Sequence, residues 1–260
     1  MPWLAMAIAL TLSACSQVQV TVPNPRLEVP ELRGDSGMAM TAGVSGAHVY
    51  SATRDGSDRP PEMDEPSALG AFDLSGGVHY SPGAPLQIGI EINGIDGYGA
   101  STILKFQIAG DGTHGADVGN LPALIYLRAG GVYGHKDGDQ NGTFGAGGYH
   151  WKGVVSGAYV HAGASMGYRL APHALLYWGG AAGQYWINSE INQDPHPSTG
   201  DAGGTYKRGD SGRAYTGGIG AEFTWTRVQF FVSAEGTSYD YKHTKAKIDP
   251  FVHAGVIITP

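Results

Sequence analysis

Apolar and polar residues alternate along one segment after another of this chain, and no sustained helical period follows its first residues. At residues 86–93 every even position is leucine or isoleucine, and the odd positions are Gln, Gly, Glu and Asn. Residues 72–80, 101–108 and 154–168 split in the same way. Successive side chains of a β-strand point to opposite faces, so each segment predicts a strand with one apolar and one polar face. The expected fold class is all-β.

The sharpest test of this pattern is a pair of strands near the C-terminus, joined by Thr226 and Arg227. With these two residues as the turn, Trp225 lies opposite Val228. The apolar faces of both strands then fall on the same side of the sheet. Register and alternation therefore agree on an antiparallel hairpin.

The composition indicates which face meets water. Only 15% of the residues are charged and 42 are glycine, whereas about 25% of an average soluble domain is charged. The polar faces carry mainly Gly, Ser, Thr and Gln, which is typical of a crowded interior. Aromatic residues gather at strand ends, where the girdles of membrane barrels lie: Tyr168, Tyr177, Trp178, Tyr185, Trp186, Trp225, Tyr239 and Tyr241. We expect apolar faces toward lipid; a soluble barrel with apolar faces inward is the alternative.

The candidate strands are residues 38–53, 69–80, 86–94, 100–109, 122–134, 147–169, 173–188, 213–225, 228–242 and 251–258. They predict an antiparallel up-and-down transmembrane β-barrel of about 8–10 strands within residues 37–260. One end has tight turns and the other mostly long polar loops. The turns are 81–85, 170–172 and 226–227, and the long loops are 54–68, 135–146 and 189–212. Outer-membrane barrels place such tight turns in the periplasm.

The only cysteine of the chain ends the run Leu12-Ser13-Ala14-Cys15, which follows a short apolar stretch without charges. This run resembles a bacterial lipoprotein signal. The resemblance implies that residues 1–14 are a signal peptide and that Cys15 carries a diacylglycerol, with palmitate as a typical acyl chain. A buried free cysteine after an ordinary N-terminal helix is the alternative.

The residues after the cysteine indicate a destination. Ser16 is not the aspartate that commonly retains such lipoproteins at the inner membrane, so the resemblance implies the outer membrane. Residues 15–36 contain Pro23, Pro25 and Pro30 and predict an extended tether between the lipid and the first strand.

Over about residues 37–258 the chain resembles the small outer-membrane β-barrels as a class. This resemblance implies an outer-membrane location with the lipid-anchored N-terminus on the periplasmic side. Outer-membrane lipids and the barrel-assembly and lipoprotein-sorting machineries are the implied partners. A net charge of -7 and the lack of a basic block argue against nucleic-acid binding.

The polar faces bring charges into the predicted lumen. These are Asp73, Glu91, Lys105, Arg128, His161, Glu222, Glu235 and His253. Buried charges must be paired, so a structural network is expected, with Glu91 and Lys105 as its first pair. A barrel of this size is just wide enough to be filled by side chains, which predicts a filled lumen. A narrow polar pathway or a proton relay is the alternative.

Asp137, Asp139 and Asn141 begin a D-x-D-x-N-G run of the kind that starts a calcium loop. Gly148 stands where such a loop has its glutamate, and no helices flank the run. A plain hairpin loop rich in Asx and glycine is the alternative. Calcium is the only cofactor that the sequence suggests.

Catalytic motifs are weak. A G-x-S-x-G run at residues 163–167 lies inside an alternating strand and not on the turn that a nucleophile elbow requires. His161 is about 13 Å along the strand from Ser165. We therefore expect a non-catalytic outer-membrane lipoprotein with a structural or surface-binding role. The alternatives are a barrel enzyme that modifies envelope lipid or peptide, and a soluble barrel lipoprotein facing the periplasm.

Overall fold

A computed structural model of the chain describes residues 16–32, 37–54, 62–63, 71–83, 85–94, 97–111, 117–140, 149–195, 203–241 and 248–259. No helix among these residues is long and apolar enough to cross a membrane. The strands are β1 (Ser16–Pro23), β2 (Gly37–Arg54), β3 (Glu62–Met63), β4 (Phe72–Gly83), β5 (Leu86–Asn93), β6 (Tyr98–Ala109), β7 (Ala123–Gln140), β8 (Tyr149–Ala171), β9 (Ala174–Gln193), β10 (Gly204–Trp225), β11 (Val228–Tyr241) and β12 (Ile248–Ile258).

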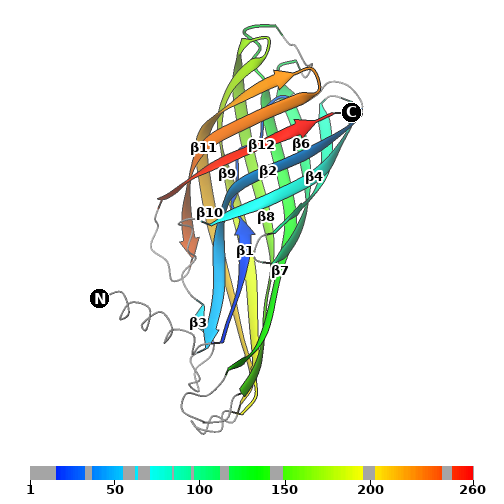
Figure 1. The fold of residues 1–260 in the computed structure, drawn as a ribbon. Coiled ribbons are helices and arrows are strands. Elements are labelled where there is room, and N and C mark those ends of the chain that lie inside the picture. The colour runs from blue at the N-terminus through cyan, green and yellow to red at the C-terminus, as the bar shows by residue number, and fades with distance from the viewer. Residues whose placement is uncertain are drawn as a thin grey trace, which may run out of the picture.

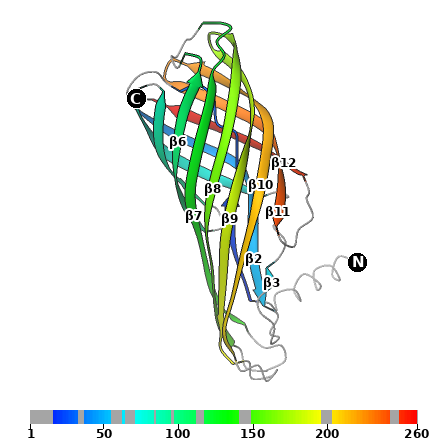
Figure 2. The same ribbon diagram turned by 180° about the vertical axis from the view of Figure 1, so that it is seen from behind.

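Within the described part of the chain, β2 and the nine strands from β4 to β12 close into an antiparallel ring (Figures 1 and 2). Strand β2 closes the ring, because it pairs with β4 on one side and with β12 on the other. The β12–β2 seam is short and joins only Ala254–Ile258 to Met40–Val44. The predicted up-and-down β-barrel is confirmed, and each of the ten predicted strands overlaps one strand of the ring.

The two ends of the barrel differ. At the end that we call the turn end, short connections follow Gly83, Ala171 and Trp225. At the opposite end, the loop end, β7, β9 and β10 are longer than predicted, so parts of the expected loops 135–146 and 189–212 are strands. The outward side chains of these strand segments are polar, and for this reason the sequence predicted loops there.

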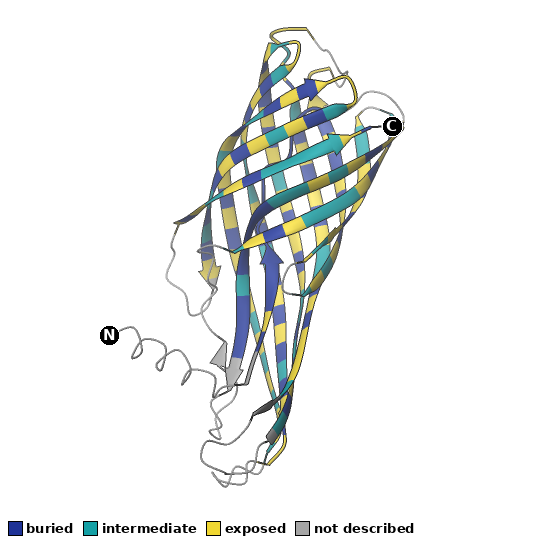
Figure 3. Cartoon of the chain, viewed as in Figure 1, coloured by how far each residue is buried: buried dark blue, intermediate teal, exposed yellow. Residues whose placement is uncertain are grey.

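Exposed and buried positions alternate along the strands of the barrel (Figure 3). Next to the turn end the exposed positions carry large apolar side chains. On β10, Tyr215, Ile219, Phe223 and Trp225 are 47–67% exposed. Ten residues at a rise of about 3.3 Å and a tilt of about 40° span about 25 Å, the height of an outer-membrane apolar band. The alternative of a soluble barrel with apolar faces inward is wrong for this region, which we call the apolar band.

The aromatic residues divide between the two faces. Trp178, Trp186 and Trp225 point outward, as predicted for girdles. The prediction was wrong for Tyr177 and Tyr185, which are fully buried. Each directly precedes an outward tryptophan, and neighbouring residues of a strand must face opposite sides. Tyr168 is also outward and Tyr239 is also buried.

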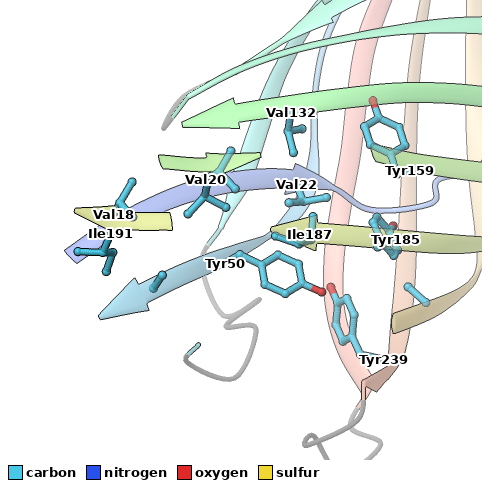
Figure 4. Packing of buried hydrophobic residues seen from close by; sticks show 13 residues of the cluster. Val18, Val20, Val22, Tyr50, Val132, Tyr159, Tyr185, Ile187, Ile191 and Tyr239 are labelled. Atoms are coloured by element: carbon cyan, nitrogen blue, oxygen red, sulfur yellow. The ribbon is translucent and has the colours of Figure 1, made fainter. Parts of the chain in front are cut away.

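Beyond the apolar band, the strands at the loop end have polar side chains outside and apolar side chains inside. On their outer side Lys152, Asn192 and Lys207 are exposed, while Ile187 and Ile191 are buried inside. Here β7–β10 form a sheet whose apolar face is covered by β1 and the second half of β2 (Figure 4). We call this part the extension; its exterior suits water and its core resembles that of a soluble sandwich.

Candidate functional site

A segment of the chain lies inside the barrel. Residues 16–32, which we call the inner segment, consist of β1 and the stretch that follows it. Except for Gln19, every residue from Val18 to Leu32 is buried. The sequence predicted an extended tether between the lipid and the first strand. In the structure the described part of this stretch lies inside the barrel, where its side chains pair with the walls.

The inner segment enters at the loop end. Strand β1 pairs with the second half of β2, from Ser16 opposite Arg54 to Pro23 opposite Ala47. Val18, Val20 and Val22 face the buried core of the extension, which includes Tyr50 and Ile187 (Figure 4). The period-2 pattern of these valines thus matches the apolar interior of the extension.

An aromatic layer separates this core from the charged lumen. The ring of His48 lies 5.0–5.2 Å from the rings of Tyr50, Tyr185 and Tyr239. Asn24 contacts His48 Nδ1 at 2.7 Å through its Oδ1, which also accepts from the Tyr239 hydroxyl at 2.9 Å. The hydroxyl of Tyr185 donates to the carbonyl oxygen of Pro23 at 3.1 Å. These bonds fix the inner segment where its apolar part ends.

The first charged layer surrounds Arg26. Its guanidinium donates to Glu91 Oε2 at 2.9 Å and to Ser75 Oγ at 3.2 Å. Arg128 also contacts Glu91, at 3.1 Å, and His79 lies 3.4 Å from its other carboxylate oxygen. Glu91 therefore joins a cation of the inner segment to a cation of the wall.

Glu28 forms the second layer. Its two carboxylate oxygens each accept at 2.7 Å, one from Arg128 and the other from Lys105. The Nε of Arg26 lies 3.3 Å away, and Ser165 Oγ donates to the backbone carbonyl of Glu28 at 2.6 Å. This carboxylate balances two wall cations that are themselves almost fully buried.

The third layer lies near the turn end. Glu31 pairs with Arg169, whose guanidinium also donates to the carbonyl of Pro172 at 3.0 Å. The backbone amide of Leu32 donates to Gln107 Oε1 at 2.8 Å. The inner segment is therefore held by charge at three successive levels of the lumen.

Glycines in the wall give the inner segment room. A Cβ at Gly134 would lie 2.5 Å from the carbonyl oxygen of Gln19, and one at Gly183 would lie 2.9 Å from Pro25 Cγ. Any larger residue at these positions would push the segment away. Part of the high glycine content is thus explained by what the lumen contains.

All eight of the predicted lumen residues are buried. The inner segment brings Glu91, Lys105 and Arg128 together, and Asp73 lies within electrostatic range of Arg26. The predicted Glu91–Lys105 pair was wrong. Lys105 stands opposite Gln87, four residues along β5 from Glu91, and pairs with Glu28 instead.

The other predicted residues have different direct partners. Glu222 accepts from Gln229 at 3.0 Å, and His161 stacks on Tyr159 at 4.6 Å between ring centroids. Glu235 lies 3.5 Å from His253 and accepts from the amide of Leu27 at 3.0 Å. These groups serve the packing of neighbouring strands and of the inner segment.

Sequence reasoning missed Arg26, Glu28, Glu31 and Arg169. Arg26 and Glu28 lie between Pro25 and Pro30 and Glu31 directly follows Pro30, so all three were taken as part of the extended tether. One signal could have found the segment, because the alternating valines predict a strand at residues 18–22.

No family model and no curated protein sequence matches this chain. The outer membrane protease OmpT from Escherichia coli is similar with a TM-score of 0.37 and 8% identity, over 95% of this chain and 97% of that chain. Ail of Yersinia pestis, an attachment invasion locus protein, is similar with a TM-score of 0.26 and 10% identity, over 88% of this chain and 98% of that chain. An anion-selective porin from Comamonas acidovorans is similar with a TM-score of 0.16 and 9% identity, over 87% of this chain and 100% of that chain.

All three TM-scores lie below 0.5, so the assignment of the fold depends on the chain's own features. These are the closed antiparallel ring, the outward apolar band and the polar interior. The chain has the fold of an outer-membrane β-barrel. In such a barrel the charges described above occupy the lumen, away from lipid.

The remaining predicted sites are only partly within the described residues. Asp137 and Asp139 lie in β7, where they pair in register with Lys152 and His150, and not in a loop. Asn141, Cys15 and the predicted signal peptide 1–14 lie outside the described residues. No cluster of His, Cys, Asp and Glu suited to a metal occurs in the part of the chain that the structure describes.

Proposed function

We propose that this chain is an outer-membrane β-barrel lipoprotein with a closed lumen and a structural or surface-binding role in the cell envelope. One observation carries the proposal: the inner segment fills the lumen and pairs with its walls through Glu91, Lys105, Arg128 and Arg169. A transport pore needs an open polar path, and here the path is occupied by the chain itself.

The apolar band supports a location in a membrane. Large side chains such as Ile90, Ile92, Ile219 and Trp225 are more than 60% exposed, and lipid would cover them. A soluble monomer rarely exposes an apolar surface of this extent. Outer-membrane lipids are therefore proposed as the first partners, together with the machineries that assemble barrels and sort lipoproteins.

The ion pairs of the inner segment support the proposal that the lumen is closed. Removing the inner segment would leave Lys105, Arg128 and Arg169 without the carboxylates of Glu28 and Glu31. Breaking a buried ion pair costs about 3–5 kcal/mol, because the remaining charge stays uncompensated. A segment held at several such levels stays permanently inside the lumen.

The extension offers the binding surface. A cleft of about 1240 Å³ opens where β5 and β6 end and β7 continues. Tyr98 and Tyr133 line its side toward the apolar band, and His135 and Lys136 line its side toward water. This cleft lies at the boundary between lipid and solvent, where a surface protein can meet a partner.

The alternative of a barrel enzyme has less support. Ser233 donates to Glu235 beside His253, but these groups are buried inside the barrel. Ser165 is occupied by the backbone of Glu28. A catalytic site needs an opening for substrate, and the described Ser and His groups of the lumen lie in an enclosed interior.

Conductance tests this function. The purified barrel is placed in planar lipid bilayers, and its folded state is verified by a shift in gel migration on heating. We expect no stable ion conductance from the intact chain. A steady conducting state of the heat-shifted, folded protein would overturn the closed lumen. Extraction of the protein from membranes by salt alone would overturn the membrane location.

A further inference from the structure

The two ends of the inner segment lie at opposite ends of the barrel. Ser16 pairs with Arg54, the last residue of β2, at the loop end. Glu31 pairs with Arg169, which bonds to Pro172 in a short connection at the turn end. Gly37 then starts β2 opposite Ser81, also at the turn end. The chain thus passes through the whole lumen before it forms the first strand of the wall.

The architecture distinguishes the two ends with respect to the membrane. At the turn end, the apolar band continues to Trp225, directly before the connection to Val228. At the loop end, the extension continues well beyond the band with a polar exterior and its own apolar core. Outer-membrane barrels keep short turns in the periplasm and long connections outside the cell. The extension therefore belongs at the cell surface.

We propose that the inner segment is an additional membrane crossing, enclosed by the barrel, which carries the N-terminus of the mature chain to the cell surface. The proposal rests on the outer-membrane location given above. It replaces the expectation that the N-terminus stays at the periplasmic side. Gly37 and Ile258 lie at the turn end, whereas Ser16 lies at the loop end.

The contacts of the segment make the crossing permanent. Arg26 and Glu28 are bonded to β5, β6 and β7, and the backbone amide of Leu27 between them donates to Glu235 on β11, across the ring. The segment cannot slide without separating these buried charges. A closed lumen of this kind offers no path for a chain end, so the barrel closes around the segment during assembly. The short β12–β2 seam joins the last strand of the ring to the first.

Cysteine labelling of intact cells tests the crossing. Gln19→Cys reports the exposed side chain of β1, Lys207→Cys reports the outer side of the extension, and Arg227→Cys reports a short turn. Each variant is treated with a membrane-impermeant maleimide before and after the outer membrane is permeabilised. The unchanged chain measures any reaction of Cys15, and the heat-induced gel shift verifies that each variant is folded.

We expect Gln19→Cys and Lys207→Cys to react in intact cells and Arg227→Cys to react only after permeabilisation. If Lys207→Cys reacts in intact cells but Gln19→Cys does not react until permeabilisation, the crossing is overturned while the barrel orientation stands. If only Arg227→Cys reacts in intact cells, the orientation is reversed and the proposal fails. Absence of the unchanged chain from the outer-membrane fraction would instead overturn the proposed function.

Discussion

Glu28 and Arg128 are 100 residues apart in the sequence, yet they form a 2.7 Å ion pair inside the barrel. Glu28 is also 2.7 Å from Lys105, so one carboxylate of the inner segment serves two buried wall cations. Glu28→Gln keeps the size of the side chain but removes its charge. We expect it to lower the free energy of unfolding by about 3–5 kcal/mol, since both cations stay buried.

The temperature of the heat-induced gel shift measures this loss. Glu190→Gln is the matched control, because Glu190 pairs with Lys207 at 3.0 Å on the exposed outer side of the extension. An exposed pair contributes at most about 1 kcal/mol. Equal shifts for the two variants would show that Glu28 is not the centre of a buried network.

Glu31 and Arg169 form a simpler pair near the turn end. Glu31→Ala leaves the guanidinium of Arg169 in the interior without its carboxylate, so a substantial loss of stability is expected. Replacing both residues, with Glu31→Ala and Arg169→Leu, removes the buried charge as well. We expect the double variant to lose about 1–3 kcal/mol less than the sum of the single variants, read from the same gel shift. Additive losses would mean that the pair is not coupled.

The barrel wall could be predicted from local alternation. In the band, each outward residue such as Ile88 or Ile90 is exposed and each inward one such as Glu91 faces the lumen, so the period-2 pattern is strong. The hairpin at Thr226 and Arg227 also fixes its own register through its two-residue turn, and Trp225 does stand opposite Val228. These features depend only on neighbours in the sequence.

The extension and the inner segment could not be read in the same way. Lys207 and Asp137 lie in strands whose outer side is polar and exposed, so their polarity suggested loops. Glu28 is buried only because Lys105 and Arg128 come from distant strands. The predicted Glu91–Lys105 pair depended on a turn centred within residues 95–99. In the structure the pairing of β5 with β6 is centred one residue earlier, so Lys105 stands opposite Gln87. Long-range pairing of this kind leaves no local signal.

The valines of β1 form part of the core of the extension. Val20 is 1% exposed, whereas its neighbour Gln19 is exposed on the other face of the strand. Val20→Ser removes apolar contacts and buries a hydroxyl, and we expect a loss of about 2–3 kcal/mol in the stability of the extension. Limited proteolysis of the folded barrel measures it, with faster cleavage at the loop end. Gln19→Ser is the control, and equally fast cleavage in that variant would contradict a role of the valine in packing.

The close approach of the wall to the inner segment can be tested at Gly134. A Cβ there would meet the carbonyl oxygen of Gln19 at 2.5 Å, and this backbone atom cannot move without disturbing the pairing of β1 with β2. Gly134→Ala is therefore expected to cost about 1–3 kcal/mol through overpacking. Gly217→Ala is the control, because Gly217 is exposed on the outer face of β10 and a Cβ there would make only an ordinary 3.8 Å contact. The measurement is the rate at which proteases remove the inner segment from the folded barrel. Equal protection of the segment in both variants would mean that β1 does not pack against β7 as described.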